Sequence, residues 1–460
     1  MTMISNVIRF SRRHLHTIVS TENIKPSLPT PSHLKTYNLS VFDQSMPSVF
    51  NPLVSFYSNP ANIMYHDQML DQLKNSLSLT LTKYYPFAGR HAKISPTFVD
   101  CNDHGAVFIE ASVDATLSDF LQNSRYHLLD PFFPYARTWK ESSCSCSGND
   151  HLQTAPLAVQ INRFECGGVG LAVSLSHKIA DGYSFIRFLS DWAKMTRVRS
   201  KNDTYHEVPI EPHFISFPNT SVNFAGSSLV SSNDCVTRSF VFPNANINEL
   251  KHKVRGMTVG CATQPTVSNP TRVEVLIWLL YKCAVEAATK NNLGAFKPTS
   301  FCLGTNIRDK MIEPLPENTV GNFLFRMEVQ TKNEMELTPK MLIGEFRNQK
   351  KKIKGIKNIE AVFAPLLNTP PSDFDIQERQ KKFENGYVFT SLCGYPVNAV
   401  DFGWGSPLKL GVPGNLRKNS FILMDASNGE GIEVHVCLEK QDMDIVEKDP
   451  ELLAFANISY

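Results

Sequence analysis

Residues 157–192 read LAVQINRFECGGVGLAVSLSHKIADGYSFIRFLSDW, and they combine strand, turn and helix patterns around one histidine. Residues 157–164 and 170–176 are apolar runs typical of buried strands, and residues 165–168 suit a turn, so we predict a β-hairpin. The apolar side chains that follow recur on one helical face: Phe185, Phe188, Leu189 and Trp192. His177 is therefore expected where the second strand gives way to a helix, a place where sheets present side chains to substrates.

The bulk composition is that of a globular protein. The chain has 460 residues, which favours two domains of ordinary size. With 42% hydrophobic and 20% charged residues and a net charge of +2, it has no excess charge that would indicate a nucleic-acid or acidic partner. No apolar run has the length of a membrane-spanning helix, so we expect no membrane partner.

Ten cysteines are scattered without the spacing of a disulfide framework. Only Cys144 and Cys146 lie close together, and no further ligands at short spacing accompany them, so no zinc site is expected. We predict ten free thiols in a reducing compartment, which favours the cytoplasm.

The N-terminus is basic. Residues 1–21 contain Arg9, Arg12 and Arg13 and no acidic residue, as in a transit peptide. The alternative is a short basic extension before a first strand at residues 16–20, and we favour this alternative. No secretory signal is evident.

The chain is predicted to divide into residues 1–205, a crossover linker at 206–234, and residues 235–460. The linker is rich in Ser, Asn, Pro and Thr and has little periodicity. In the first domain we expect an amphipathic helix at 67–85 and a strand at 105–110.

The second domain is predicted to open with a strand at 237–242. Residues 273–288 are apolar nearly all round, as in a buried helix. Residues 421–424 and 432–438 flank an Asn-Gly pair and predict a second hairpin. The basic run 350–357 is interpreted as a solvated helix face.

His177 has two interpretations from the residues alone. A neutral imidazole can act as a general base toward an alcohol or amine, and its ordinary pKa suits that role. The alternative is a structural histidine at the start of the helix. Asp181 is four positions on, but His177 stands at a strand end, so a structural ion pair between Asp181 and an arginine is favoured over a catalytic triad. Gly182 lets the backbone turn tightly.

Residues 401–405, Asp-Phe-Gly-Trp-Gly, form a second motif. Two glycines around a tryptophan indicate a rigid loop, which either supports an active site or is simply an aromatic-anchored turn. The chain lacks the G-x-S-x-G, G-x-x-x-x-G-K-[ST] and H-E-x-x-H patterns, so serine hydrolase, P-loop and zincin activities lose their usual support.

Together these two motifs resemble the paired signature of the plant BAHD acyltransferases, HxxxD at His177–Asp181 and DFGWG at Asp401–Gly405. Their order and separation also match, and the resemblance extends from about residue 16 to the end. Further matching segments are residues 24–27, 85–90, 271–274, 306–308 and 321–323.

The resemblance implies an α/β fold of two similar domains, each a mixed β-sheet flanked by helices, as in chloramphenicol acetyltransferase. A channel between them would bring an acyl-CoA co-substrate and a small-molecule acceptor to His177 from opposite sides. It implies acyl transfer to a hydroxyl or amine by a monomeric, cytoplasmic enzyme that needs no metal and no resident cofactor.

The resemblance also assigns residues. His177 would be the catalytic base, with Asp401 a second candidate catalytic residue. Asp181 would pair with Arg308, Gly182 would belong to the same turn, and the loop with Gly403 and Trp404 would shape the CoA side. Thr390 is the oxyanion candidate, while Leu392 replaces a tryptophan common in the family. The residues that bind the CoA phosphates stay unassigned.

Within the family, the chain is most similar to vinorine synthase-like alkaloid O-acetyltransferases. Residues 319–323 read Thr-Val-Gly-Asn-Phe, where malonyl-transferring members show Tyr-Phe-Gly-Asn-Cys. We therefore expect acetyl-CoA as donor and a specialised metabolite, such as a monoterpene indole alkaloid, as acceptor. The alternatives are malonyl-CoA or another acyl donor, a terpenoid or phenolic alcohol, a hydrolase, and a non-catalytic binding protein on the same fold.

Overall fold

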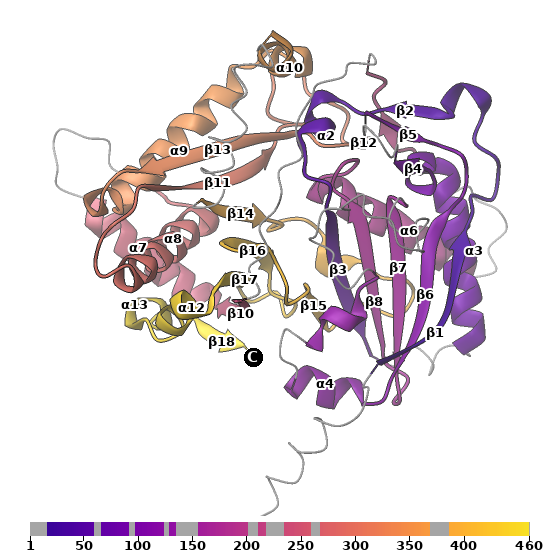
Figure 1. The fold of residues 1–460 in the computed structure, drawn as a ribbon, viewed down its shortest axis with the longest axis horizontal. Coiled ribbons are helices and arrows are strands. Elements are labelled where there is room, and N and C mark those ends of the chain that lie inside the picture. The colour runs from indigo at the N-terminus through magenta and orange to yellow at the C-terminus, as the bar shows by residue number, and fades with distance from the viewer. Residues whose placement is uncertain are drawn as a thin grey trace, which may run out of the picture.

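Two mixed β-sheets with helices packed against them make up the protein, seen side by side in the computed structural model (Figure 1). The structure describes residues 16–58, 66–91, 97–123, 128–134, 155–200, 210–217, 234–258, 267–368 and 386–459. The mixed α/β class predicted from the sequence is confirmed. The basic N-terminal extension and most of the linker lie outside the described residues.

The first sheet has the strand order β1-β6-β7-β8-β3-β15. β6 and β7 run parallel, and the other neighbours are antiparallel. Helices α3 and α6 pack against each other over one face, and their apolar side chains share a core with the sheet. The bounds are β1 (His16–Ile24), β3 (Phe50–Tyr57), β6 (Ala106–Val113), β7 (Leu157–Phe164), β8 (Val169–Ser176), β15 (Lys409–Gly411), α3 (His66–Lys83), α4 (Leu117–Asn123) and α6 (Gly182–Ser200).

The second sheet has the order β13-β11-β14-β16-β17-β10-β18, and β14 runs parallel to both of its neighbours. The long helix α8 begins at a reciprocal capping box made by Thr271 and Glu274, and it is buried nearly all round, as predicted. The bounds are β10 (Cys235–Phe242), β11 (Thr299–Asn306), β13 (Leu324–Thr331), β14 (Tyr387–Ser391), β16 (Ser420–Asp425), β17 (Ile432–Glu439), β18 (Asn457–Ser459), α7 (Asn244–Thr258), α8 (Arg272–Asn291) and α9 (Pro339–Lys354).

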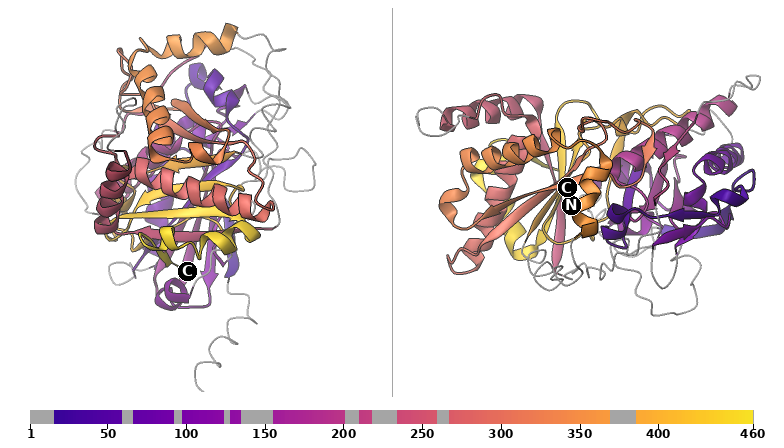
Figure 2. Two further views of the ribbon diagram at one scale, coloured as in Figure 1. Left: turned by 90° about the vertical axis from the view of Figure 1, so that its left-hand side faces the viewer. Right: turned by 90° about the horizontal axis from the view of Figure 1, so that it is seen from above.

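Shorter elements complete the fold around the two sheets (Figure 2). A three-stranded sheet has the order β2-β5-β4, and β9 pairs with β12. The bounds are β2 (Thr36–Asn38), β4 (Arg90–His91), β5 (Phe98–Asp100), β9 (His213–Phe214), β12 (Thr319–Val320), α2 (Val41–Ser45), α10 (Ile359–Asn368), α12 (Lys440–Val446), α13 (Pro450–Leu453) and the 3-10 turns η1 (Ser32–Leu34), η3 (Tyr85–Ala88), η5 (Asp130–Phe132), η6 (Glu334–Glu336) and η8 (Val397–Ala399).

The locally patterned elements lie where the sequence predicted them. The hairpin β7–β8, the hairpin β16–β17 and the helix α3 are confirmed within a few residues. Lys351, Lys352 and Lys354 are exposed on α9, which confirms the solvated face. Seven of the ten cysteines are described and form no disulfide, while Cys144, Cys146 and Cys261 lie outside the described residues.

One segment of the second half returns to the first sheet, where β15 pairs antiparallel with β3. Phe402 packs edge-on against Trp192 at 4.9 Å between ring centroids, and Trp404 packs against Tyr57 at 5.3 Å. The Tyr57 hydroxyl donates to the Val400 carbonyl at 2.9 Å. The returning segment, residues 400–412, therefore shares the core of the first sheet although it follows the predicted domain boundary at residue 235. For the other residues after 235, the assignment to a second domain stays a prediction.

The aromatic anchor of the returning segment can be tested by Phe402→Ala. Phe402 is 1% exposed, so truncation leaves a cavity and should lower the free energy of unfolding by about 3–5 kcal/mol. Urea denaturation measures the change. The matched control is Leu408→Ala in the same segment, where the side chain is 52% exposed and stability should stay within about 0.5 kcal/mol of the wild type. Equal stabilities for the two variants would contradict this account.

Candidate active site

His177 is presented to solvent by an otherwise buried stretch of chain. β8 ends at Ser176 and α6 begins at Gly182, as the strand and helix patterns predicted. Every residue from Val169 to Asp181 is buried except His177, which is partly exposed. Its backbone N–H donates to the Val49 carbonyl at 2.8 Å, so the turn is fixed against β3. The imidazole is therefore held by a rigid backbone at a position that is only partly exposed.

Asn322 fixes the orientation of the His177 ring. Its Nδ2 donates to the His177 carbonyl at 2.7 Å and to Asp43 Oδ1 at 2.8 Å. Both partners are acceptors, so the amide nitrogen is assigned, and Oδ1 of Asn322 must face Nδ1 of His177 at 3.0 Å. Nδ1 then carries the proton and donates it to the amide oxygen. The other ring nitrogen, Nε2, keeps its lone pair.

This arrangement prepares His177 to accept a proton. Burial lowers the pKa of His177 below its ordinary value near 6.5. A hydrogen bond to its own backbone, the Asp181 charge and the Asn322 hydrogen bond oppose this shift, and the Lys178 charge adds a smaller lowering effect. The ring is therefore neutral at pH 7. A neutral imidazole with Nδ1–H fixed and Nε2 free is the form that acts as a general base.

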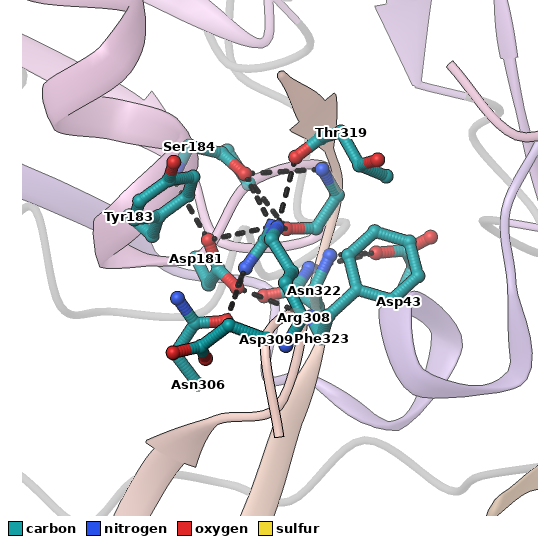
Figure 3. Close-up of polar contacts among 12 residues, drawn as sticks. Asp43, Asp181, Tyr183, Ser184, Asn306, Arg308, Asp309, Thr319, Asn322 and Phe323 are labelled. Atoms are coloured by element: carbon teal, nitrogen blue, oxygen red, sulfur yellow. Dashed lines mark hydrogen bonds and ion pairs between the residues drawn. The ribbon is translucent and has the colours of Figure 1, made fainter. Parts of the chain in front are cut away.

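Asp43 also holds Asn322 in place (Figure 3). Its Oδ1 accepts both the backbone N–H and the side-chain N–H of Asn322, at 3.0 and 2.8 Å. Its Oδ2 accepts from Ser40, which caps α2 in a reciprocal capping box. Burial raises the pKa of Asp43, and these hydrogen bonds oppose that shift. Neither Asp43 nor Asn322 was predicted as a site residue from the sequence. The Ser40-x-x-Asp43 pattern indicates where a helix begins, but it does not indicate that Asp43 contacts Asn322.

Asp181 pairs with Arg308 rather than with His177. Arg308 Nη1 and Nη2 donate to the two carboxylate oxygens of Asp181 at 2.8 and 3.2 Å, and both side chains are buried. Backbone N–H groups of Ser184 and Phe323 also donate to this carboxylate. Burial raises the pKa of Asp181, but Arg308 more than offsets this and the pKa is lowered. The ion pair implied by the resemblance is present, and it leaves no carboxylate for a His177 triad.

Arg308 also organises the chain around it (Figure 3). It donates to the carbonyls of Thr319 and Gly321 at 2.9 and 3.0 Å. The rings of Tyr183 and Phe323 each lie 4.8 Å from its guanidinium carbon. Residues 319–323, which carry Asn322, are thereby fixed to the start of α6.

Gly182, the residue after Asp181, lies close to the Leu392 side chain. A Cβ atom on Gly182 would lie 2.8 Å from Leu392 Cδ2, so a larger residue would require the end of the Leu392 side chain to move. This contact places Leu392 beside the His177–Asp181 turn. Thr390, two residues earlier in β14, is exposed. Its role as an oxyanion donor stays a prediction.

Asp401 shapes its own loop. One carboxylate oxygen accepts the backbone N–H groups of Gly403, Trp404 and Gly405 at 2.7–2.9 Å. Gly403 and Gly405 have φ angles of 97° and 86°, which favour glycine. Arg197 donates to the Asp401 carbonyl and links the loop to α6. These contacts favour the architectural interpretation of the motif, and a catalytic role for Asp401 stays a prediction.

Within the described part of the chain, no cluster of His, Cys, Asp and Glu side chains has the grouping of a metal site. No helix there is both long and apolar enough to cross a membrane.

The buried ion pair can be tested by Asp181→Asn. The substitution leaves the Arg308 charge buried without its counter-charge, so the free energy of unfolding should fall by about 3–5 kcal/mol. Urea denaturation is the measurement. Glu313→Gln is the control, because Glu313 pairs with Lys357 at an exposed position. The free energy of unfolding of this control variant should not change. An Asp181→Asn protein as stable as the wild type would remove the structural role assigned to the pair.

Known proteins resemble this chain along almost its whole length. A Transferase family model matches residues 15–453. Akuammiline synthase 1 of Alstonia scholaris is 36% identical over 96% of this chain and 97% of its own. Deacetylvindoline O-acetyltransferase of Catharanthus roseus is 34% identical over 94% and 96%. A 17,18-epoxy-17-hydroxycur-19-ene N-malonyltransferase of Strychnos nux-vomica is 35% identical over 96% and 90%.

Solved structures also resemble this chain over most of its length. The crystal structure of vinorine synthase superposes with a TM-score of 0.78 at 30% identity, covering 96% of this chain and 98% of its own. The TRI101 protein of F. sporotrichioides, complexed with coenzyme A and T-2, gives a TM-score of 0.65 at 16% identity, with coverages of 92% and 100%. The two-domain architecture expected from the sequence is therefore confirmed. The chain belongs to the Transferase family of BAHD acyltransferases and is an acyl-transferring enzyme.

Proposed function

We propose that this protein transfers an acetyl group from acetyl-CoA to a hydroxyl of a plant specialised metabolite, such as a monoterpene indole alkaloid. The observation that carries the proposal is the His177 ring, partly exposed and held by Asn322 with Nε2 as its unprotonated nitrogen. The relatives named for alkaloid products support the acceptor class. His177 is the catalytic base.

In the proposed reaction, Nε2 of His177 removes the proton of the acceptor hydroxyl as its oxygen attacks the thioester carbonyl. The resulting imidazolium is stabilised by Asn322, because the Nδ1–H bond to the amide oxygen favours the charged ring. His177 then returns the proton to the departing CoA thiolate. General-base action contributes roughly 10²–10⁴-fold, so binding both substrates side by side must supply much of the remaining rate enhancement.

Stabilisation of the oxyanion is assigned to the region of Thr390. Its hydroxyl is exposed on β14, whose end lies beside Gly182 through Leu392. Removing one such donor typically costs about 3–4 kcal/mol of transition-state stabilisation. We further propose that Asp401, Gly403 and Trp404 act on the CoA side by keeping their loop in shape, with no part in proton transfer.

Malonyl-CoA is the second candidate donor. The Strychnos relative at 35% identity is named as an N-malonyltransferase, so donor choice differs among proteins of similar distance from this chain. The sequence Thr-Val-Gly-Asn-Phe at residues 319–323 favours acetyl. We also propose that the enzyme acts as a monomer in the cytoplasm, in keeping with the free thiols of the described cysteines.

The proposed base can be tested by His177→Ala. CoA release from acetyl-CoA and malonyl-CoA is measured with a thiol reagent across a panel of alkaloid alcohols, with product identified by mass spectrometry. The variant should keep its fold by circular dichroism and lose roughly 10²–10⁴-fold in kcat. His104→Ala, at an exposed position, should retain full activity.

Three outcomes would contradict the proposal. Full activity in His177→Ala would show that His177 is not the base. CoA release by the wild type without any acceptor indicates a hydrolase. Binding of acyl-CoA with no transfer to any alcohol or amine indicates a binding protein.

The pH dependence of kcat/KM follows from the His177 pKa. The reaction needs the neutral ring, and burial lowers the pKa below 6.5. The rate constant should therefore rise with pH along a single limb centred below pH 6.5 and stay level from there to pH 8. Initial rates in overlapping buffers of constant ionic strength measure the limb. A limb centred above pH 6.5 would show that the base is a different or differently placed group.

A further inference from the structure

His91 is a second histidine beside the catalytic turn. It is the last residue of β4, in the small sheet β2-β5-β4, and nothing in the proposed reaction uses it. Its Nε2 lies 2.9 Å from Oγ of Ser176, the residue immediately before His177. The two histidines are thus connected through one serine.

The other ring nitrogen of His91, Nδ1, lowers the stability of the fold. Nδ1 is buried and has no hydrogen-bond partner among the residues that the structure describes. Burial, with a smaller effect of the Lys178 charge, lowers the pKa of His91 to about 4, so the ring is neutral at pH 7. A buried polar atom without a partner destabilises a protein, and an apolar side chain would avoid that cost. Packing alone does not account for a histidine here.

The Ser176 hydroxyl joins His91 to the turn. Its oxygen accepts the backbone N–H of Lys178 at 3.3 Å. The same hydroxyl shares a hydrogen bond with Nε2 of His91, and either group can be the donor. The Ser176 backbone also takes part, because its N–H donates to Pro156 and its carbonyl accepts from Ile179. Ser176 therefore fixes the chain on both sides of His177.

We propose that His91 is a positioning residue for the reaction, which through Ser176 holds the turn that carries His177. The inference rests on the proposed role of His177 as the base. Asn322 orients the ring from one side, while His91 and Ser176 hold its backbone from the other. Residues that break a rule of stability without compensation elsewhere in the core are expected at sites that serve function.

Four variants test this proposal: His91→Leu, His91→Gln, Ser176→Ala and the double variant His91→Leu/Ser176→Ala. His91→Leu should lower kcat roughly 10- to 100-fold, because small misplacements of a catalytic group have effects of that size. KM for acyl-CoA and acceptor should not change. The melting temperature should change little, since the substitution removes both a buried atom without a described partner and the hydrogen bond between His91 and Ser176.

The remaining variants separate positioning from general structure. Gln can still reach Ser176 Oγ with a side-chain amide, so His91→Gln should recover most of kcat. Ser176→Ala should resemble His91→Leu, and the double variant should be no worse than either single variant. His16→Leu is the control: this partly exposed histidine of the same half pairs with Asn162, and kcat should be unaffected.

Imidazole ¹⁵N NMR of histidine-labelled protein provides a readout without turnover, with the His177 signals assigned by their loss in His177→Ala. His91→Leu should shift the His177 signals, whereas His16→Leu should not. Unchanged kcat and unchanged His177 signals in His91→Leu would overturn the proposal, as would a kcat that falls only in proportion to lost folded protein. If the wild type transfers no acyl group, the proposed function fails, and the NMR comparison still decides whether His91 positions His177.

Discussion

The buried ion pair between Asp181 and Arg308 determines where the rest of the site lies. Asp181 ends the turn after β8, whereas Arg308 follows β11 in the second half of the chain. Their bonds, together with those from Ser184 and Phe323, fix residues 319–323 against α6. Those residues contain Asn322, so the same interaction that joins the two halves sets the amide that orients His177.

An arginine is required in this position because of the number of groups that converge on it. Its nitrogen atoms donate to both Asp181 oxygens, to Ser184 Oγ and to two backbone carbonyls. A lysine has three donors on one atom and cannot form this planar arrangement. A buried ion pair contributes little net stability compared with apolar packing. The Asp181–Arg308 pair instead determines how the two halves are arranged, since few other arrangements would satisfy both charges.

Local sequence patterns predicted the elements but not the partners of the site. The apolar runs of β7, β8 and α8 carry their own periodicity, and His177 was placed at a strand end for the same reason. The residues alone favoured an ion pair between Asp181 and an arginine, but Arg308 was identified as the partner only through the family resemblance. Asp43 and Asn322 are separated by 279 positions, and neither lies in a pattern that points to the other. The role proposed for His91 could not be predicted from the sequence either, because it depends on the contact with Ser176 and on an Nδ1 atom that has no partner among the described residues.

The return of β15 to the first sheet limits how this protein can be divided. A fragment that ended in the linker would lack Phe402 and Trp404, and it would leave β3 as an uncovered edge with unpaired backbone groups. Such edges recruit other chains and cause aggregation. If two relatives exchanged halves at that linker, the first sheet of each hybrid would receive its sixth strand, β15, from the other relative. The chain therefore behaves as one inseparable unit for recombination, even though its sheets look like two modules.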